Sequence, residues 1–305
     1  MIIMMKIIDV HTHGIGGYDT KTTVLDNILK IADIHGSHGV SEIVLSIYPS
    51  KIDNMRKHIE VVKKAIEKQP PHPPLTKGGS RGVDQSAPHA IPTNIVGVHL
   101  EGPFLNPEKS GALDKKTFIE PTEYHFEKLI EGFEGIVKIV TIAPELKGAL
   151  RLIKTMSDCG IIVNMGHSNA TYAEAEAGYH AGARGITHIF NAMRGFHHRE
   201  PGLTGFGLLH NDVYIEVIAD PYHLDRKTLE LIFRTKNPKR IIVVSDTVRE
   251  SKTTDNQAIT DVHKKLSGGC ITITESSRRL IEMGFDEHIV ENCITKNPKR
   301  YLSKK

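Results

Sequence analysis

The stretch Ile-Ile-Asp-Val-His-Thr-His-Gly at residues 7–14 predicts a buried parallel β-strand that runs directly into a loop. Side chains two residues apart in a strand point to the same face, so we expect His11 and His13 to point together, as two imidazole ligands of one divalent cation do. The chain holds 18 histidines among 305 residues, and one His-x-His triplet is expected by chance about once in such a chain. The positions of the other His, Asp and Glu residues therefore decide whether the pair has a function.

Strand-length apolar stretches alternate with helical patterns along the rest of the chain. We expect further strands at residues 41–48, 95–103, 136–142, 161–167, 185–188, 214–219 and 240–246. We expect helices at residues 22–39, 51–68, 121–133, 146–158, 172–181 and 276–302, and a short hairpin over residues 265–274 that turns at Gly268-Gly269. This alternation predicts a (β/α)8 barrel. A doubly wound open sheet is the alternative, but residues 14–17 lack the G-x-G-x-x-G loop that it would need after the first strand.

At 305 residues the chain is long enough for one large α/β barrel or for two smaller domains. From the strand and helix pattern we expect residues 1–305 to form a single catalytic barrel. A net charge of +3 without a long basic run argues against a nucleic-acid partner. No apolar run approaches the length of a membrane span, and residues 1–6 lack the basic start of a signal peptide. The cysteines, Cys159, Cys270 and Cys293, form no C-x-x-C motif, which predicts reduced thiols in a cytoplasmic protein.

Residues 69–93 differ in composition from the rest of the chain. They hold six prolines and three glycines but few large apolar residues. Such a composition forms no packed element, so we expect a disordered insertion between a helix and a strand, which either acts as a lid or has no role. Neither of the histidines inside it, His72 and His89, is expected to be a metal ligand.

Ligand-type side chains stand where five of the expected strands end. In a barrel those ends meet at one opening, where active sites are built. The strands are otherwise apolar, so a polar residue at the last position needs a reason. A cation of the zinc type, held by imidazoles and carboxylates with a position left for water, would support metal-assisted hydrolysis. The residues are His11, His13, Glu101, His167, His188 and Asp246, and Asp246 is the one placed to take a proton from water and give it to a leaving amine.

Several long motifs occur in order along the chain. They are His-Leu-Glu-Gly-Pro-Phe (99–104), Gly-His-Ser-Asn-Ala-Thr (166–171), Thr-His-Ile-Phe-Asn-Ala-Met (187–193), Arg-Glu-Pro-Gly-Leu (199–203), Ala-Asp-Pro-Tyr-His (219–223) and Ser-Asp-Thr (245–247). Together they resemble the motifs of N-acetylglucosamine-6-phosphate deacetylases of the amidohydrolase superfamily. The resemblance runs from residue 11 to residue 302 and leaves out the insertion.

The resemblance implies a divalent metal and a catalytic aspartate. Glu101, His167 and His188 match the main metal ligands of the family, and Asp246 matches its catalytic residue. His11 and His13 match members that hold a second metal, so one or two ions are expected. Zinc is the expected metal, with iron, manganese and cobalt as alternatives.

The resemblance also implies a substrate, an amino-sugar phosphate, and a homodimer. Asn191 and the backbone of Ala192 match the substrate-holding loop, whereas Arg199 and His223 match residues that hold the sugar phosphate. In the family the arginine commonly reaches the site of a neighbouring subunit. The implied reaction removes the acetyl group of N-acetylglucosamine-6-phosphate and yields glucosamine-6-phosphate and acetate.

The chain departs from the family pattern in two ways. Where members often have Gly-Ala-His near the substrate, this chain has Gly-Ala-Leu at residues 111–113, so the polar contact is missing at Leu113. The small β-sandwich that members build from both chain ends is expected to be absent. Two alternatives follow: a sister amidohydrolase for another acylamide or cyclic amide, and a catalytically silent sugar-phosphate binding protein. The retained ligands and Asp246 argue against the silent protein.

Overall fold

The computed structural model describes residues 6–69, 93–252 and 257–303. Eight strands form one parallel sheet in which each strand pairs with the next along the chain. They are β1 (Ile7–Thr12), β4 (Val40–Ile47), β5 (Asn94–Glu101), β6 (Val137–Ile142), β7 (Ile162–Met165), β8 (Gly185–Ile186), β9 (Tyr214–Ile218) and β10 (Ile241–Val244).

The sheet closes between its first and last strands. The Asp246 N–H donates to the His11 carbonyl at 2.9 Å, and the His13 N–H donates to the Thr247 carbonyl at 2.8 Å. A small antiparallel pair, β2 (Gly14–Ile15) and β3 (Tyr18–Asp19), follows β1. Closure of consecutive parallel strands confirms the (β/α)8 barrel, and the open doubly wound sheet is excluded.

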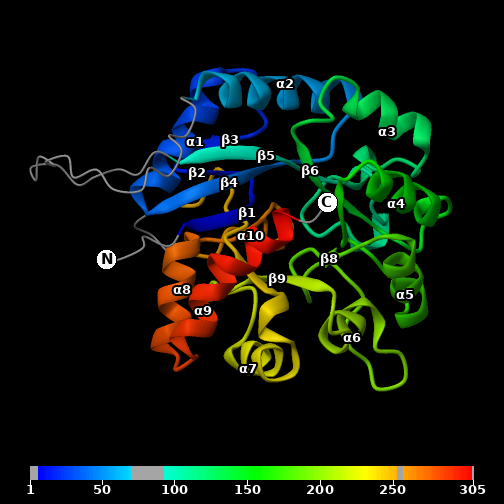
Figure 1. Ribbon diagram of the computed structural model, residues 1–305, viewed down its shortest axis with the longest axis vertical. Helices are drawn as coiled ribbons and strands as arrows, with labels where there is room; N and C mark the ends of the chain where they lie inside the picture. Colours follow the sequence, from blue (N-terminus) through cyan, green and yellow to red (C-terminus); the bar gives the residue numbers. More distant parts are fainter. Residues whose placement is uncertain (1–5, 70–92, 253–256, 304–305) are drawn as a thin grey trace, which may run out of the picture.

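Helices surround the strands (Figure 1). In chain order they are α1 (Leu25–Ser37), α2 (Ile52–Lys68), α3 (Glu123–Ile130), α4 (Ala149–Asp158), α5 (Tyr172–Ala181), α6 (Gly202–Leu209), α7 (Arg226–Thr235), α8 (Ile273–Glu282), α9 (Glu287–Ile294) and α10 (Lys296–Leu302), with short 3₁₀ turns at Pro107–Lys109, Lys115–Thr117 and Pro238–Arg240. Capping boxes define the starts of α5 and α8, where Thr171 pairs with Glu174 and Thr272 with Glu275. No helix in the described ranges is long and apolar enough to span a membrane.

The interior of the barrel is filled from its amino end by apolar side chains. Ile8, Ile162, Tyr214 and Ile242, near the starts of their strands, pack with Tyr301 of α10. Helix α10 lies across the centre of the barrel in Figure 1. The amide of its Asn297 donates to the carbonyls of Pro238 and Ile241, the latter being the first residue of β10. The amino end of the barrel is therefore packed, and the carboxyl end is left for the pocket.

Irregular pairing sets the direction of the polar side chains of β1 and β5. The register between β1 and β4 shifts between Asp9 and Thr12, and the register between β5 and β6 shifts between Val98 and His99. A bulge of this kind redirects the side chains that follow it. Nε2 of His11 and Nε2 of His13 lie 3.3 Å apart, so the expected common orientation of the pair is confirmed.

One expectation about the segment after β10 was wrong. The hairpin expected at residues 265–274 does not form there: the turn lies at residues 261–265, where Thr260 and Leu266 form an antiparallel bridge. Residues 273 and 274 already belong to α8, because the Thr272 capping box starts the helix there. The helical region expected at 276–302 is confirmed, and it consists of three helices, α8, α9 and α10, separated at residues 283–286 and 295.

Helix α6 was not among the expected helices because three of its eight residues are glycine. Gly207 allows close packing against the barrel, and Gly205 allows close packing against the residue that precedes the helix. A Cβ on Gly207 would lie 2.6 Å from Cδ1 of Ile186, and one on Gly205 would lie 2.3 Å from Cβ of Pro201.

Most of the expected insertion, residues 70–92, lies outside the described residues, so the division of the chain into one domain with an insertion stays a prediction. Its two ends are described. The Gln69 side chain donates to the Thr93 carbonyl and accepts from the Ile95 N–H, each at 2.9 Å. One amide therefore joins the end of α2 to the start of β5.

Candidate active site

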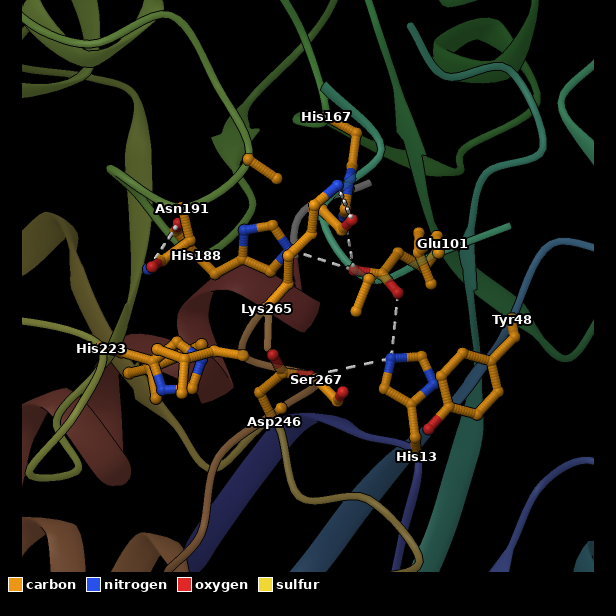
Figure 2. A pocket seen from close by; sticks show the side chains of 17 residues that line it. His13, Tyr48, Glu101, His167, His188, Asn191, His223, Asp246, Lys265 and Ser267 are labelled. Carbon is orange, nitrogen blue, oxygen red and sulfur yellow. Dashed lines mark hydrogen bonds and ion pairs between the residues drawn. The ribbon is translucent and has the colours of Figure 1, made fainter. Parts of the chain in front are cut away.

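A cavity of about 250 Å³ opens at the carboxyl end of the barrel (Figure 2). Five of the six predicted metal-site residues line it, and His11 lies directly behind His13 and Asp246. Asn191, Ala192 and His223 line it as well. The structure thus brings together nine of the ten residues singled out from the sequence, and the tenth, Arg199, is treated below.

Glu101 is the point on which three imidazoles converge. Its Oε1 lies 3.1 Å from Nε2 of His167 and 3.0 Å from Nε2 of His188, and its Oε2 lies 3.0 Å from Nε2 of His13. All four side chains are buried. Burial opposes ionisation of Glu101, but His13 and the hydrogen bonds from His167 and His188 hold the pKa of this carboxyl well below its usual range.

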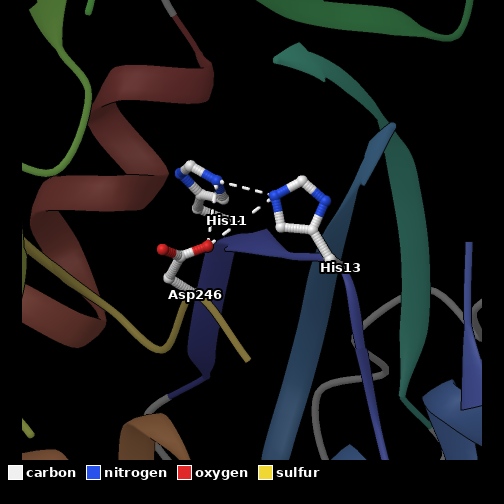
Figure 3. Close-up of side chains that lie close together, drawn as sticks. All are labelled: His11, His13 and Asp246. Atoms are coloured by element: carbon white, nitrogen blue, oxygen red, sulfur yellow. Dashed lines mark hydrogen bonds and ion pairs between the residues drawn. The ribbon is translucent and has the colours of Figure 1, made fainter. Parts of the chain in front are cut away.

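A second group of ligand atoms lies beside the first (Figure 3). Nε2 of His11 is 3.3 Å from Nε2 of His13 and 3.3 Å from Oδ1 of Asp246. Nε2 of His13 is 3.7 Å from the same carboxylate oxygen. Since Glu101 Oε1 is 3.6 Å from His11 Nε2, the carboxylate of Glu101 is close to both groups and is placed to bridge them.

The balance of buried carboxylates and buried basic side chains fits a divalent cation at this site. Buried carboxylates gather in the barrel at Asp9, Glu101, Glu216 and Asp246. In the described residues the one buried basic side chain of the Lys or Arg type is Lys236, whose ammonium donates to the Gly207 and His210 carbonyls instead. Buried negative charge without such a partner is costly, and imidazole nitrogens with carboxylates are a suitable ligand set for metals of the zinc type.

A second layer of residues fixes the orientation of His11. Its Nδ1 lies 2.9 Å from Oε2 of Glu216 on β9, which leaves Nε2 for the centre. The Asn164 amide donates to the other oxygen of Glu216 at 2.7 Å, and the Tyr301 hydroxyl of α10 hydrogen-bonds Asn164. Burial disfavours the charged form of His11, but Asp246, Glu216 and Glu101 together raise its pKa to about 10. A carboxylate behind a ligating histidine is a common feature of metal sites.

Glu216 was not found by reasoning from the sequence. A signal existed, because it is a carboxylate in the middle of the otherwise apolar strand at residues 214–218. Tyr48 was also missed: it follows the β4 strand, and its ring stacks on His13 with centroids 3.8 Å apart. No feature of the sequence distinguished Tyr48 from a residue that merely ends a strand.

Backbone strain is concentrated at the pocket. Among the described residues, six that are not glycine have a positive φ, and four of these line the cavity. They are His167 (+46°), His188 (+28°), Ala192 (+49°) and Asp246 (+48°). Such conformations cost about 1–3 kcal/mol each and persist where the surrounding structure imposes them, typically at functional sites.

The wall opposite the metal-ligand groups carries the predicted substrate contacts. The Asn191 amide donates to the carbonyls of His188 and Ile189, each at 3.3 Å, which holds the loop before Ala192. His223 is oriented by Asp220, whose Oδ2 lies 2.9 Å from Nδ1. Burial opposes ionisation of Asp220, but His223 and nearby backbone N–H groups lower its pKa to about 2.

Arg199 lies outside this cavity. It is exposed, in the loop between β8 and α6, and its backbone N–H donates to Nδ1 of His197 at 3.3 Å. The structure therefore does not bring Arg199 to the pocket of its own chain. A role in holding phosphate would have to be exercised in a neighbouring subunit, and it stays a prediction.

A closed parallel (β/α)8 barrel with two adjoining groups of His, Glu and Asp at the carboxyl ends of its strands has the architecture of a metal-dependent hydrolase.

Leu113, in place of the histidine of the family motif, lines the same cavity. It offers no polar contact there.

Comparison with known proteins agrees with this class. N-acetylglucosamine-6-phosphate deacetylase of Bacillus subtilis (strain 168) is 32% identical over 249 residues, which are 81% of this chain and 58% of that enzyme. N-acetylgalactosamine-6-phosphate deacetylase of Escherichia coli O157:H7 is 28% identical over 289 residues, which are 90% of this chain and 71% of that enzyme. No family model matches the chain.

A solved structure shares the fold. It is a mutant N-acetyl-D-glucosamine-6-phosphate deacetylase of Mycobacterium smegmatis in complex with N-acetyl-D-glucosamine-6-phosphate, with a TM-score of 0.84, 24% identity and coverage of 98% of this chain and 77% of that one. The chain is thus similar in sequence to N-acetylglucosamine-6-phosphate deacetylases and shares the barrel fold of this solved structure. It spans 58% of the length of the Bacillus subtilis relative.

Proposed function

We propose that the chain is a divalent-metal-dependent deacetylase that hydrolyses the acetamide of N-acetylglucosamine-6-phosphate to glucosamine-6-phosphate and acetate. The observation that carries the proposal is the convergence of His13, His167 and His188 on Glu101 in the cavity that also holds Asp246. A buried aspartate with φ +48° that belongs to one of two adjoining candidate ligand groups suits turnover better than binding alone.

We propose zinc as the metal, with one or two ions bound per chain. Glu101, His167 and His188 would hold the first, and His11 and His13 would hold the second, with Glu101 between them. When bound, such a cation supplies Lewis acidity, which polarises the amide carbonyl and allows water to act as nucleophile at neutral pH.

Asp246 is the proton carrier. Its Oδ1 faces Nε2 of His11, and its side chain lines the cavity from below. In the reaction, the oxygen of water adds to the acetamide carbonyl carbon and its proton passes to the Asp246 carboxylate. The C–N bond then breaks as Asp246 returns the proton to the leaving nitrogen. The products are acetic acid and the amine, and the remaining proton of the acid passes to the amine or to solvent at neutral pH, which leaves acetate.

The sugar would be held by the wall formed by Asn191, Ala192 and His223. His223, whose Nδ1 is engaged by Asp220, has Nε2 available for a substrate oxygen. We further propose a homodimer in which Arg199 extends to the site of the partner, because a guanidinium binds phosphate in a bidentate manner and this one is exposed. The three free cysteines suit a reducing, cytoplasmic compartment.

The test is acetate release by the metal-loaded chain from a panel of N-acetylated amino sugars, each with and without a 6-phosphate. We expect N-acetylglucosamine-6-phosphate to be the best substrate and a chelator to abolish the reaction until metal is restored. Turnover of a different acylamide or a cyclic amide, with none of the sugar phosphate, would make the chain a sister amidohydrolase.

The galactosamine epimer is a second candidate substrate and belongs in the panel. The supporting observation is the similarity, over 90% of this chain, to a relative that is an N-acetylgalactosamine-6-phosphate deacetylase. The ratio of kcat/KM for the two epimers decides between them.

A further inference from the structure

The segment that follows β10 places the side chain of Lys265 at the cavity. Residues 261–265 form a tight turn in which the Asp261 N–H donates to the Lys265 carbonyl at 2.8 Å. The Asp261 carboxylate accepts the N–H groups of His263 and Lys265 at 2.8 and 2.9 Å. The backbone of Lys265 is thus held at the base of the turn, and its side chain lines the pocket (Figure 2).

The ammonium of Lys265 reaches a loop on the other side of the cavity. Its Nζ donates to the Gly111 carbonyl at 3.1 Å. Gly111 itself lies against the site, since a Cβ built on it would be 3.6 Å from Cε1 of His167 and 3.3 Å from Cβ of Ala192. The ammonium is therefore held by the carbonyl of a loop that itself packs against a candidate metal ligand and the predicted substrate-holding residue.

Lys265 is the one Lys or Arg side chain among the described residues that line this cavity. An ammonium has three N–H donors, and the Gly111 carbonyl takes one of them. Within the described residues no carboxylate oxygen lies within 4 Å of its Nζ, and the Asp261 carboxylate interacts with its charge only from a longer distance. The neighbouring Leu113 side chain has no polar atom. Donors and charge at the rim of the pocket are thus left for an anionic ligand.

We propose that Lys265 is a specificity-determining residue that binds the anionic group of the substrate, a phosphate monoester carried by the sugar. The inference rests on the proposed function for the identity of the substrate. The Lys265 contact belongs to the same chain as the metal ligands, whereas Arg199 lies outside the cavity of its own chain. Because Lys265 is exposed, solvent screens the interaction, and we expect a contribution of about tenfold in affinity.

The variant Lys265→Gln removes the charge and keeps a polar side chain. Its matched control is Lys264→Gln, which removes the same charge one residue earlier in the turn, outside the cavity lining. We expect Lys265→Gln to raise KM for N-acetylglucosamine-6-phosphate about tenfold while kcat stays close to the wild-type value, since the phosphate is remote from the reacting amide. Lys264→Gln should behave as wild type, and Lys265→Arg should keep most of the preference for phosphate.

A second readout separates this inference from the proposed reaction. Glucose 6-phosphate and glucose have no acetamide, so their binding, measured by calorimetry on the same proteins, does not depend on turnover. If the wild type releases no acetate but Lys265→Gln weakens glucose 6-phosphate binding about tenfold, the proposed reaction fails and the role of Lys265 stands. Equal KM and equal binding for wild type and Lys265→Gln would overturn the inference. Equal losses with the phosphorylated and plain sugars would overturn it too, since Lys265 would then only hold the Gly111 loop.

Discussion

Replacement of Asp246 by asparagine tests the proposal that this residue carries the proton. Asp246 has φ +48°, a conformation that asparagine adopts more readily than most residues. Its backbone N–H donates to the His11 carbonyl at 2.9 Å, and its carbonyl accepts from the Gly269 N–H at 2.8 Å. Neither bond involves the side chain, so Asp246→Asn keeps the local main chain and removes only the proton-accepting carboxylate.

The expected loss follows from the role of the group. General acid–base catalysis by one positioned side chain contributes about 10²–10⁴-fold, which corresponds to about 3–5 kcal/mol in the activation barrier. Because the side chain is buried and isosteric with asparagine, the fold and sugar binding should change little. We therefore expect kcat to fall by about that factor with a small change in KM.

The assay is the rate of acetate release, with metal content measured on the same samples because Asp246 lies beside His11 and His13. Asp158→Asn, an exposed aspartate paired with Lys154 on the surface, serves as the control and should leave the rate unchanged. A variant that keeps more than about a tenth of the wild-type rate with its metal intact would refute the assignment, because another group would then move the proton.

Three further perturbations test the layers around this residue. The double change His11→Ala and His13→Ala should lower bound metal by one equivalent, while Glu101, His167 and His188 keep the other ion. Loss of both ions in elemental analysis, or retention of both, would contradict this. Glu216→Gln should weaken metal binding about 10- to 100-fold in a chelator competition, because the carboxylate behind His11 is replaced by an amide. Asp220 has its pKa lowered from 3.8 to about 2, so its hydrogen bonds contribute about 2 kcal/mol to folding above pH 4, and this is lost as pH falls from about 4 to 2. Asp220→Asn should therefore be less stable than wild type at pH 7 and differ from it less at pH 2; a difference independent of pH would contradict that reading.

Much of the fold followed from local patterns. Each strand of the barrel is a short buried run, and the turn and helix signals between runs are strong enough to count the βα units. The ligands could be found because polar side chains at the ends of apolar strands have few structural explanations. This pattern predicts one site for Glu101, His167, His188 and Asp246, and the structure brings them together in two adjoining groups.

Other features depend on tertiary structure and could not be found in that way. The register shifts in β1 and β5 arise from strand pairing, which a single sequence does not display. Helix α6 has poor intrinsic propensity and exists because its glycines allow it to approach Ile186 and Ile189. Lys265 enters the pocket because a turn at 261–265 directs it there, and the expected hairpin was placed several residues too late to reveal it.

The central claim is that this pocket hydrolyses the acetamide of an amino-sugar phosphate. The most direct measurement is the simultaneous determination of acetate and free amine in one reaction of the metal-loaded chain with N-acetylglucosamine-6-phosphate. The account predicts that both products appear together in equal amounts, that chelation stops both, and that Asp246→Asn reduces both alike. Tight binding of the sugar phosphate by metal-loaded protein, with neither acetate nor amine formed, would contradict the account and leave a sugar-phosphate binding protein built on a hydrolase barrel.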